Sequence, residues 1–302
     1  MDVSVIIVNY KTTALTVNAI KSIIEQTQGI EFEVIVVDNA SQDYCKDKLI
    51  GIFHDKVKVL ELPQNIGFGR ANNEGVKIAQ GRNIFFLNPD TILLNNAIQI
   101  LSKYLDEHTF VGACGGNLYN EQLCPTHSLI RLFPSVLYEL NILLGGLPLK
   151  LRYGKNYQFN HTIKPIEVAY VLGADLMVKH DIIKQIGGFD ERFFMFFEET
   201  DLCFRIRKNN WKIMAISAAQ IQHLESKSFA DTINERRITY FETGRETFYT
   251  IHYSKKYHKI ANQIYALTII SHQFLSKILF NNQGHTFWKL KKDIFKTTRK
   301  KL

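Results

Sequence analysis

Oxygen-bearing side chains occur along the chain in short clusters that could bind a charged ligand or move a proton. The clusters are Asn9-Tyr10, Asp38-Asn39-Ala40-Ser41, Asn88-Pro89-Asp90 and Glu198-Glu199-Thr200-Asp201, with His223 some twenty residues further on. Carboxylates bind divalent cations and accept protons, and an imidazole can do either. Each cluster also has a structural interpretation, because Asx turns, Asn-Pro-Asp turns and acidic helix N-termini are common.

The first three clusters each follow a segment with the pattern of a buried β-strand. The predicted strands are Val3–Val8, Phe32–Val37, Val57–Leu60 and Asn83–Leu87, with one helix that Thr12 or Thr13 can cap and another at Ala71–Ala79. This alternation predicts an α/β fold with a doubly wound, mostly parallel sheet. Because such sheets bind ligands at the carboxyl ends of their strands, we expect the three clusters to share one site.

The second half of the chain is less regular. Residues 129–156 mix apolar and basic side chains and support no assignment. Beyond them the pattern predicts a strand at Tyr170–Val178 interrupted at Gly173, a helix at His180–Ile186, a helix from Glu199 and a strand at Trp211–Ile216. After Arg236 the spacing of apolar residues is largely helical.

The composition is that of an ordinary globular protein with a basic tail. Of 302 residues, 46% are hydrophobic and 22% charged, and the net charge is +8. Residues 254–302 hold eleven Lys or Arg and one acid, so the basicity lies in the tail. The four cysteines form no C-x-x-C pair, which favours reduced thiols over zinc ligands. We see no secretion signal and no membrane-spanning run, and we expect a cytoplasmic protein.

Seven motifs, in order, resemble the family-2 glycosyltransferases of GT-A fold. They are Val5–Tyr10, Val34–Ser41, Asn65–Asn73, Phe86–Thr91, Gly173–Asp175, Gly187–Glu191 and Phe197–Cys203. The resemblance covers roughly residues 3–225 and implies a GT-A catalytic domain at 1–235, followed by a helical basic extension at 236–302. It further implies a nucleotide-sugar-binding half at 1–110 and an acceptor-side half at 111–235. Asn88-Pro89-Asp90 together with Arg131–Ser135 is most similar to the rhamnosyltransferase branch.

The resemblance implies a site for a nucleoside diphosphate sugar. Asp38 would accept the N3–H of uracil or thymine, with Asn9 and Asn39 beside the same base. Arg70 would offer a cation towards the base or the diphosphate. The expected donor is a dTDP- or UDP-linked sugar, with dTDP-rhamnose the first choice.

The resemblance also implies a divalent metal, Mg²⁺ or Mn²⁺. Asp90 stands for the last residue of the family's Asp-x-Asp motif, and a hard cation bridging two phosphates needs such an oxygen ligand. Asn88 replaces the first aspartate, so the metal has one carboxylate fewer. His223 is similar to a family position that binds the metal or the leaving phosphate.

The catalytic base is implied by the same comparison. The family usually has Glu-Asp before a helix with the aspartate as base, and here Glu199 takes that position with one extra methylene. Asp201 is the competing candidate. If the segment is already helical, Glu198 and Asp201 share one face and Glu199 points elsewhere.

The expected function is therefore inverting sugar transfer to a hydroxyl of a glycan or lipid-linked acceptor, in the synthesis of cell-envelope polysaccharide. Acceptor specificity is expected to reside in residues 129–165. The alternative is a catalytically inactive nucleotide-sugar binder or assembly partner. A dinucleotide-binding oxidoreductase is disfavoured, because Gly67-x-Gly69 does not follow the first strand and position 72 is Asn.

The basic tail has two interpretations. Its lysines, with Phe274, Leu275, Ile278, Leu279, Phe280, Phe287 and Trp288, suit an anionic membrane surface and would place the protein on the inner face of the cell membrane. Alternatively, these helices pack onto the catalytic domain. A nucleic-acid partner is not expected, because the tail has no recognised motif.

Overall fold

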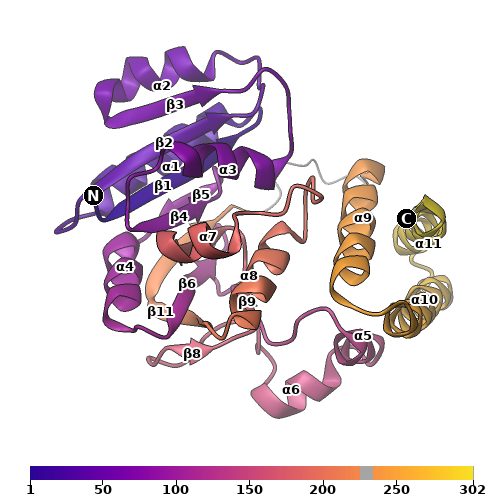
Figure 1. Ribbon diagram of the computed structural model, residues 1–302. Coiled ribbons are helices and arrows are strands. Elements are labelled where there is room, and N and C mark those ends of the chain that lie inside the picture. The colour runs from indigo at the N-terminus through magenta and orange to yellow at the C-terminus, as the bar shows by residue number, and fades with distance from the viewer. Residues whose placement is uncertain (225–233, 302) are drawn as a thin grey trace. The chain divides into compact units, whose positions relative to one another are not determined.

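The computed structural model describes residues 1–224 and 234–301 and is an α/β structure followed by helices (Figure 1). The strands of its main sheet are β1 (Val3–Asn9), β2 (Phe32–Asp38), β3 (Val57–Glu61), β4 (Asn83–Leu87), β5 (Thr91–Leu93), β6 (Val111–Tyr119), β8 (Ile166–Glu167), β10 (Asp175–Lys179) and β11 (Lys212–His223). A second, two-stranded sheet pairs β7 (Leu129–Ile130) with β9 (Tyr170–Val171).

The main sheet has the strand order β3-β2-β1-β4-β10-β6-β11-β5, with β8 paired to β11. The first four strands are parallel, as their apolar, β-branched runs predict, while β10 runs antiparallel between β4 and β6. The expected α/β fold is confirmed, with a mixed sheet in which four strand pairings are parallel and four are antiparallel. The strand expected at Tyr170–Val178 is in fact two strands, β9 and β10, separated by a turn at Gly173.

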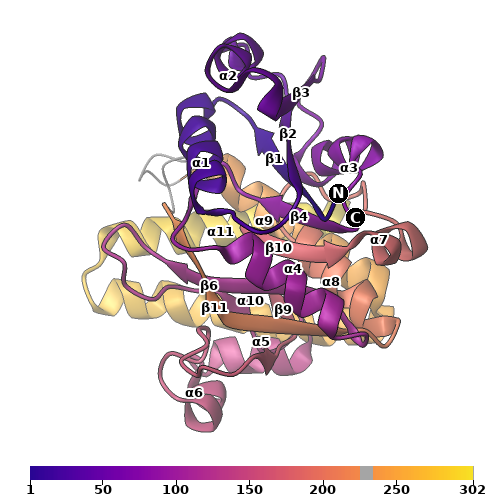
Figure 2. The ribbon, with the colours of Figure 1, turned by 90° about the vertical axis from the view of Figure 1, so that its left-hand side faces the viewer.

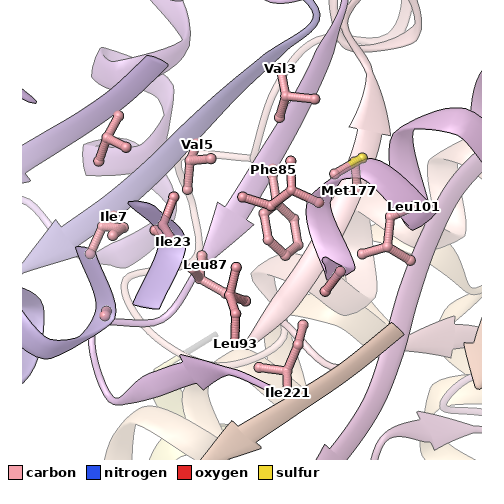
Figure 3. Packing of buried hydrophobic residues seen from close by; sticks show 14 of the residues in the cluster. Val3, Val5, Ile7, Ile23, Phe85, Leu87, Leu93, Leu101, Met177 and Ile221 are labelled. Carbon is pink, nitrogen blue, oxygen red and sulfur yellow. The ribbon is translucent and has the colours of Figure 1, made fainter. Parts of the chain in front are cut away.

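Helices cover both faces of this sheet (Figure 2). The helices of this part are α1 (Thr13–Gln26), α2 (Cys45–Phe53), α3 (Phe68–Ile78), α4 (Ala97–Glu107), α7 (His180–Ile186) and α8 (Glu198–Lys208), with a 3₁₀ turn at His54–Lys56. Residues of α1, α2 and α4 pack on the face that carries Val5 and Phe85 (Figure 3). Alternate strand residues face the other side, where a Cβ on Gly75 of α3 would lie 2.7 Å from Ile6.

The chain divides into two compact units. Unit 1 contains residues 1–131, 158–194 and the described part of 198–230, and it holds the main sheet. Unit 2 contains residues 132–157, 195–197 and the described part of 231–302. Its helices are α5 (Val136–Leu143), α6 (Leu147–Tyr153), α9 (Glu235–His252), α10 (Lys255–Ile278) and α11 (Asn282–Lys301). The helical C-terminal region is thus confirmed, and residues 132–157, which the sequence left unassigned, form helices of the same unit.

Candidate active site

The carboxyl ends of β1 and β2 bring Asn9 and Asp38 together. The two residues are register partners in the parallel pair. Asn9 Nδ2 donates to Asp38 Oδ1 at 2.9 Å, and Ser41 Oγ donates to the same oxygen. Asn9 Oδ1 accepts from Thr12 and Thr16, both at 3.0 Å, so its amide is fully engaged within the protein. Asn9 therefore orients the buried Asp38 carboxylate, a role that the sequence did not distinguish from contact with a base.

Asn39 fixes the loop between β3 and α3. Its side chain accepts from the Ile66 N–H at 2.9 Å and donates to Asn65 Oδ1 and the Gly67 carbonyl. Gly67 has φ +92°, and a Cβ there would lie 2.4 Å from the Phe194 carbonyl oxygen, so a side chain would not fit. Arg70, in the first turn of α3, is half-exposed and donates from Nε to the Glu191 carbonyl at 2.9 Å.

The Asn88-Pro89-Asp90 turn and His223 are distant in sequence but meet at the end of β4. His223 ends β11 and pairs with Thr91 of β5, which places its ring beside the 88–90 turn. His223 Nε2 lies 3.3 Å from Asp90 Oδ1 and 3.5 Å from Asn88 Nδ2. Both Asp90 and His223 are largely buried. The three residues that the sequence associates with metal binding therefore form one cluster.

The donor set of this cluster fits a divalent cation. It offers a carboxylate oxygen, an imidazole nitrogen and an amide oxygen, a mixture compatible with Mn²⁺ or Mg²⁺. The substitution of Asn88 for an acid leaves two ionisable ligands here. In the described part of the chain, three acidic, histidine or cysteine side chains have their ligand atoms within 4.8 Å of one another at a different place. They are Asp38, Asp43 and Cys45.

The Asp38–Asp43–Cys45 group is less suited to a metal. Burial raises the pKa of the Cys45 thiol to about 12, so the thiolate that a metal needs is scarce at neutral pH. Asp43 Oδ2 accepts from Thr13 at 2.7 Å, and Asp38 Oδ1 accepts from Asn9 and Ser41. These contacts bind the group into the fold around Asp38.

Glu198 and Glu199 begin α8, where the sequence predicts a helix to begin near Glu199, and their side chains lie against different elements. A Cβ on Gly69 of α3 would be 3.3 Å from Glu198 Cβ, whereas a Cβ on Gly173 would be 3.3 Å from Glu199 Cβ. The adjoining Ala174 carbonyl accepts from the Asn88 N–H at 3.0 Å. Of the two glutamates, Glu199 therefore lies beside the segment that is bonded to the Asn88–Asp90–His223 cluster.

Burial raises the pKa of both glutamates. The pKa of Glu198 lies well above its usual value, because the side chain is desolvated and the Glu199 charge is adjacent. The pKa of Glu199 is also raised by desolvation, and the N–H groups of Glu199 and Thr200 partly offset this. Among the described residues, Glu198 Oε2 has no hydrogen-bond partner. A carboxylate with a raised pKa is a stronger base towards an alcohol than an exposed one.

Asp201, the competing candidate, is engaged elsewhere. Its Oδ2 accepts from Arg205 Nε at 2.7 Å within α8, and Asp201 is fully buried. Arg205 also donates to the carbonyls of Ile186, Gly187 and Gly188. This pair fastens the helix to the glycine turn, which is a structural role.

Gly244 in α9 carries no signal in the sequence, and the structure places it against the residues preceding Glu198. A Cβ on Gly244 would be 2.6 Å from the Phe196 carbonyl oxygen and 3.1 Å from Phe197 Cδ2. Phe196 and Phe197 have φ values of 67° and 72°, in the left-handed region that costs about 1 kcal/mol or more for such residues. Positive φ in consecutive bulky residues cannot be inferred from their types, so this strained turn could be found only in the structure.

Comparison with known proteins identifies the family. Residues 4–164, more than half of the chain, match the model for glycosyl transferase family 2, so the chain belongs to this family. It is 27% identical over 216 residues to the low-salt glycan biosynthesis hexosyltransferase Agl10 of Haloferax volcanii, covering 70% of this chain and 64% of that protein. It is 25% identical over 209 residues to the N-acetylglucosaminyl-diphospho-decaprenol L-rhamnosyltransferase of Mycobacterium tuberculosis, covering 65% and 67%.

The fold is also found in solved glycosyltransferases. A crystal structure of GalNAc-T7 with UDP, GalNAc and Mn²⁺ superposes with a TM-score of 0.63 at 13% identity, covering all of this chain and 56% of that one. The expected GT-A fold is thereby confirmed.

Proposed function

We propose that the chain is an inverting, metal-dependent glycosyltransferase that moves a sugar from a nucleoside diphosphate to an acceptor hydroxyl. The observation that carries this proposal is the link between Glu199 and the Asn88–Asp90–His223 cluster through Gly173 and Ala174. A single displacement needs a base and a site for the departing diphosphate, and inversion needs them on opposite sides of the anomeric carbon. Glu199 as the base and the Asn88–Asp90–His223 cluster as the diphosphate site meet the first of these requirements, and both belong to unit 1.

In this proposal each residue has one task. Asp38, held by Asn9 and Ser41, accepts the N3–H of a uracil or thymine base, and Asn39 shapes the Ile66–Gly67 loop beside it. Arg70 contributes a cation at the start of α3. Asp90 and His223, with Asn88, would hold Mn²⁺ or Mg²⁺, which when bound supplies positive charge next to the diphosphate.

Glu199 is the proposed general base. It takes the proton of the acceptor hydroxyl as that oxygen bonds to the anomeric carbon and the bond from this carbon to the diphosphate oxygen breaks. The products are the glycoside, the nucleoside diphosphate and a protonated Glu199. Its raised pKa places the carboxylate nearer the working pH, which favours proton transfer.

The expected donor is dTDP-rhamnose, or a UDP-hexose, and the expected acceptor is a glycan or lipid-linked hydroxyl. The rhamnosyltransferase relative, whose name specifies a diphospho-decaprenol acceptor, supports the choice of sugar and acceptor, and the choice of base rests on Asp38. A lipid-linked acceptor would require the protein at an anionic membrane on the cytoplasmic side, through residues 254–302. Among the helices that the structure describes, none combines the length and the apolar character of a membrane span.

Isothermal titration with UDP, dTDP and GDP, each with Mn²⁺ and with chelator, tests the donor site. We expect UDP or dTDP to bind tightest, chelator to weaken binding, and Asp90→Asn to remove the metal effect with the fold retained. Tightest binding of GDP would refute the role of Asp38. Nucleotide-sugar binding without turnover of any acceptor or of water would favour the inactive binder, an alternative consistent with Asn88.

A further inference from the structure

Unit 2 exposes an unusual share of large apolar side chains. Among the described residues, fourteen of twenty-four exposed large hydrophobic side chains lie in unit 2, which holds about a third of the chain. In unit 1 these side chains are scattered. In unit 2 they lie mainly on α5, α6 and α10, where they recur at intervals of three, four or seven residues and so share a helix face. Contiguous exposed apolar surface marks a binding site more often than isolated residues do.

Five exposed leucines follow one another on α5, on α6 and in the turn between them, and are hereafter called the leucine row. They are Leu137 (67% exposed), Leu140 (38%), Leu144 (57%), Leu147 (54%) and Leu151 (79%). On each helix they recur at three or four residues, so they share one face. The opposite side of α5 is anchored, because Glu139 bonds to Arg245 and the Val136 N–H donates to Tyr257 Oη at 3.0 Å. The exposure of the row is therefore not a sign of a loosely held segment.

The helix α10 also exposes apolar side chains along one face. Ile260, Leu267 and Phe274 are exposed and recur every seven residues, which is two helical turns, and Phe280 after the helix is 92% exposed. Its other face packs in the unit through Ala261, Tyr265 and Ile269. In contrast, Phe287 and Trp288 of α11 are only partly exposed, and Trp288 stacks on His272 with ring centroids 4.6 Å apart.

The exposed charges on these two segments are all positive. Residues 132–157 carry one acid, Glu139, which is buried, and α10 carries none. The exposed cations are Lys150, Arg152, Lys155, Lys255, Lys256, Lys259 and Lys277. Leucines flanked by lysine and arginine, with no exposed acid between them, are complementary to anionic lipid headgroups above an apolar layer.

We infer that the leucine row of α5 and α6 is a membrane-insertion element, which docks with α10 into the headgroup region of an anionic bilayer. This inference rests on the proposed membrane location and deepens it: the basic tail attracts the surface, and the leucine row supplies the apolar contact. It also connects the segment expected to determine acceptor specificity, residues 129–165, with a lipid-linked acceptor.

Vesicle flotation of the full chain tests the inference without any nucleotide sugar. The test variant is Leu144→Gln/Leu147→Gln/Leu151→Gln. The control is Phe110→Gln/Leu123→Gln/Ile163→Gln, three apolar residues of unit 1 that are comparably or more exposed. With vesicles of phosphatidylglycerol and phosphatidylcholine we expect the leucine-row variant to lose binding by at least about tenfold and the control to retain it. Phosphatidylcholine alone should bind the wild type less.

Several outcomes would overturn the inference. Equal flotation of the leucine-row variant and the wild type is one. Another is a dimer of the wild type that the variant lacks, with no vesicle binding by either, because the row would then bind a second copy. If the triple variant does not fold, Leu151→Trp replaces it, with Ile163→Trp as control. Only the former should show a blue-shifted emission on anionic vesicles, and no shift would refute insertion. Titration of UDP separates these results from failure of the donor site.

Discussion

Each unit of the chain buries a group of carboxylates, and the two groups differ in their surroundings. In unit 2, Glu139, Glu242 and Glu246 surround Arg245, which is 2% exposed. Lys291 lies 3.3 Å from Glu242, and His258 lies 2.9 Å from Glu246. The pKa of Glu246 is below its usual value although burial opposes this, because His258, Arg245 and Asn262 all favour the charged form. Burial raises the pKa of Glu242, and the charges of Lys291 and Arg245 partly offset this.

In unit 1, Glu198 is buried and Glu199 is half-buried, with no such compensation. Within the described residues neither forms an ion pair, and burial raises the pKa of both. Burying an uncompensated charge costs stability, so a fold keeps such a pair mainly where function needs it. The comparison teaches that a charged cluster is to be judged by its partners. The Arg245 cluster has a cation for each carboxylate and joins α5, α9, α10 and α11, whereas the Glu198–Glu199 pair has none and is available for chemistry.

The largest expected effect tests the uncompensated pair. Glu199→Gln removes the proposed base but keeps its volume, so we expect kcat to fall by about two to four orders of magnitude with the donor Kd nearly unchanged. Steady-state kinetics and UDP titration measure the two quantities.

Two neighbouring variants serve as controls for Glu199. Glu198→Gln should lower kcat less than Glu199→Gln, while Asp201→Asn should mainly lower stability by loosening Arg205. Loss of chemistry in Asp201→Asn alone, with donor binding and stability retained, would assign the base to Asp201.

The second prediction concerns the Arg245 cluster, whose disruption should lower the stability of the fold. Arg245→Met leaves Glu139 and Glu246 buried without their shared cation, and we expect the free energy of unfolding to fall by about 3–5 kcal/mol. Urea denaturation measures it. The exposed Arg152→Met in the same unit is the control and should change stability by less than about 0.5 kcal/mol. Similar losses of unfolding free energy in both variants would mean that the Arg245 cluster does not stabilise the fold more than an exposed cation does.

A third prediction concerns Gly244, through which unit 2 holds the turn that precedes Glu198. Gly244→Ala forces the Phe196 carbonyl away from α9, because the new Cβ would start 2.6 Å from it. We expect a stability loss of about 1–3 kcal/mol and, because Phe196 and Phe197 lead directly into α8, a fall in kcat of roughly tenfold.

The control for Gly244 is Gly51→Ala in α2. A Cβ at Gly51 meets nothing within 4 Å, so this variant should be neutral or slightly stabilising. Unchanged kcat in Gly244→Ala, despite lower stability, would show that the turn does not position the base.

The sequence predicted the parts of this architecture that depend on local pattern. The strands β1, β2 and β4 are nearly continuous apolar runs, and the polar residues that follow them could be placed at one edge of the sheet. It could not predict that β11 continues from Ile216 to His223, because Ser217-Ala218-Ala219-Gln220 has little strand character and the pairing with β5 is a tertiary contact. The Glu139–Arg245 pair joins residues 106 positions apart, for which no local signal exists.

The last prediction tests the comparison at a third buried carboxylate, Asp175 of β10. Asp175 is fully buried, its Oδ2 accepts from the Gly116 N–H at 2.5 Å, and among the described residues Oδ1 has no partner. Burial raises its pKa well above the usual value, so the folded protein holds a proton that the unfolded chain releases near pH 4.

The sign of the pH dependence follows. A carboxyl with a raised folded-state pKa contributes its full stability below the unfolded-state pKa, and this contribution is lost as the pH rises towards the folded-state pKa. Asp175→Asn mimics the protonated form and should escape that loss. We therefore expect the free energy of unfolding of the variant, relative to wild type, to increase between pH 4 and pH 8, by about 1.4 kcal/mol for each unit of pH over which only the unfolded chain is ionised. Urea denaturation across this range is the measurement. A difference that stays constant with pH would show that Asp175 is ionised in the folded protein, and an uncompensated buried carboxylate would then no longer distinguish the two units.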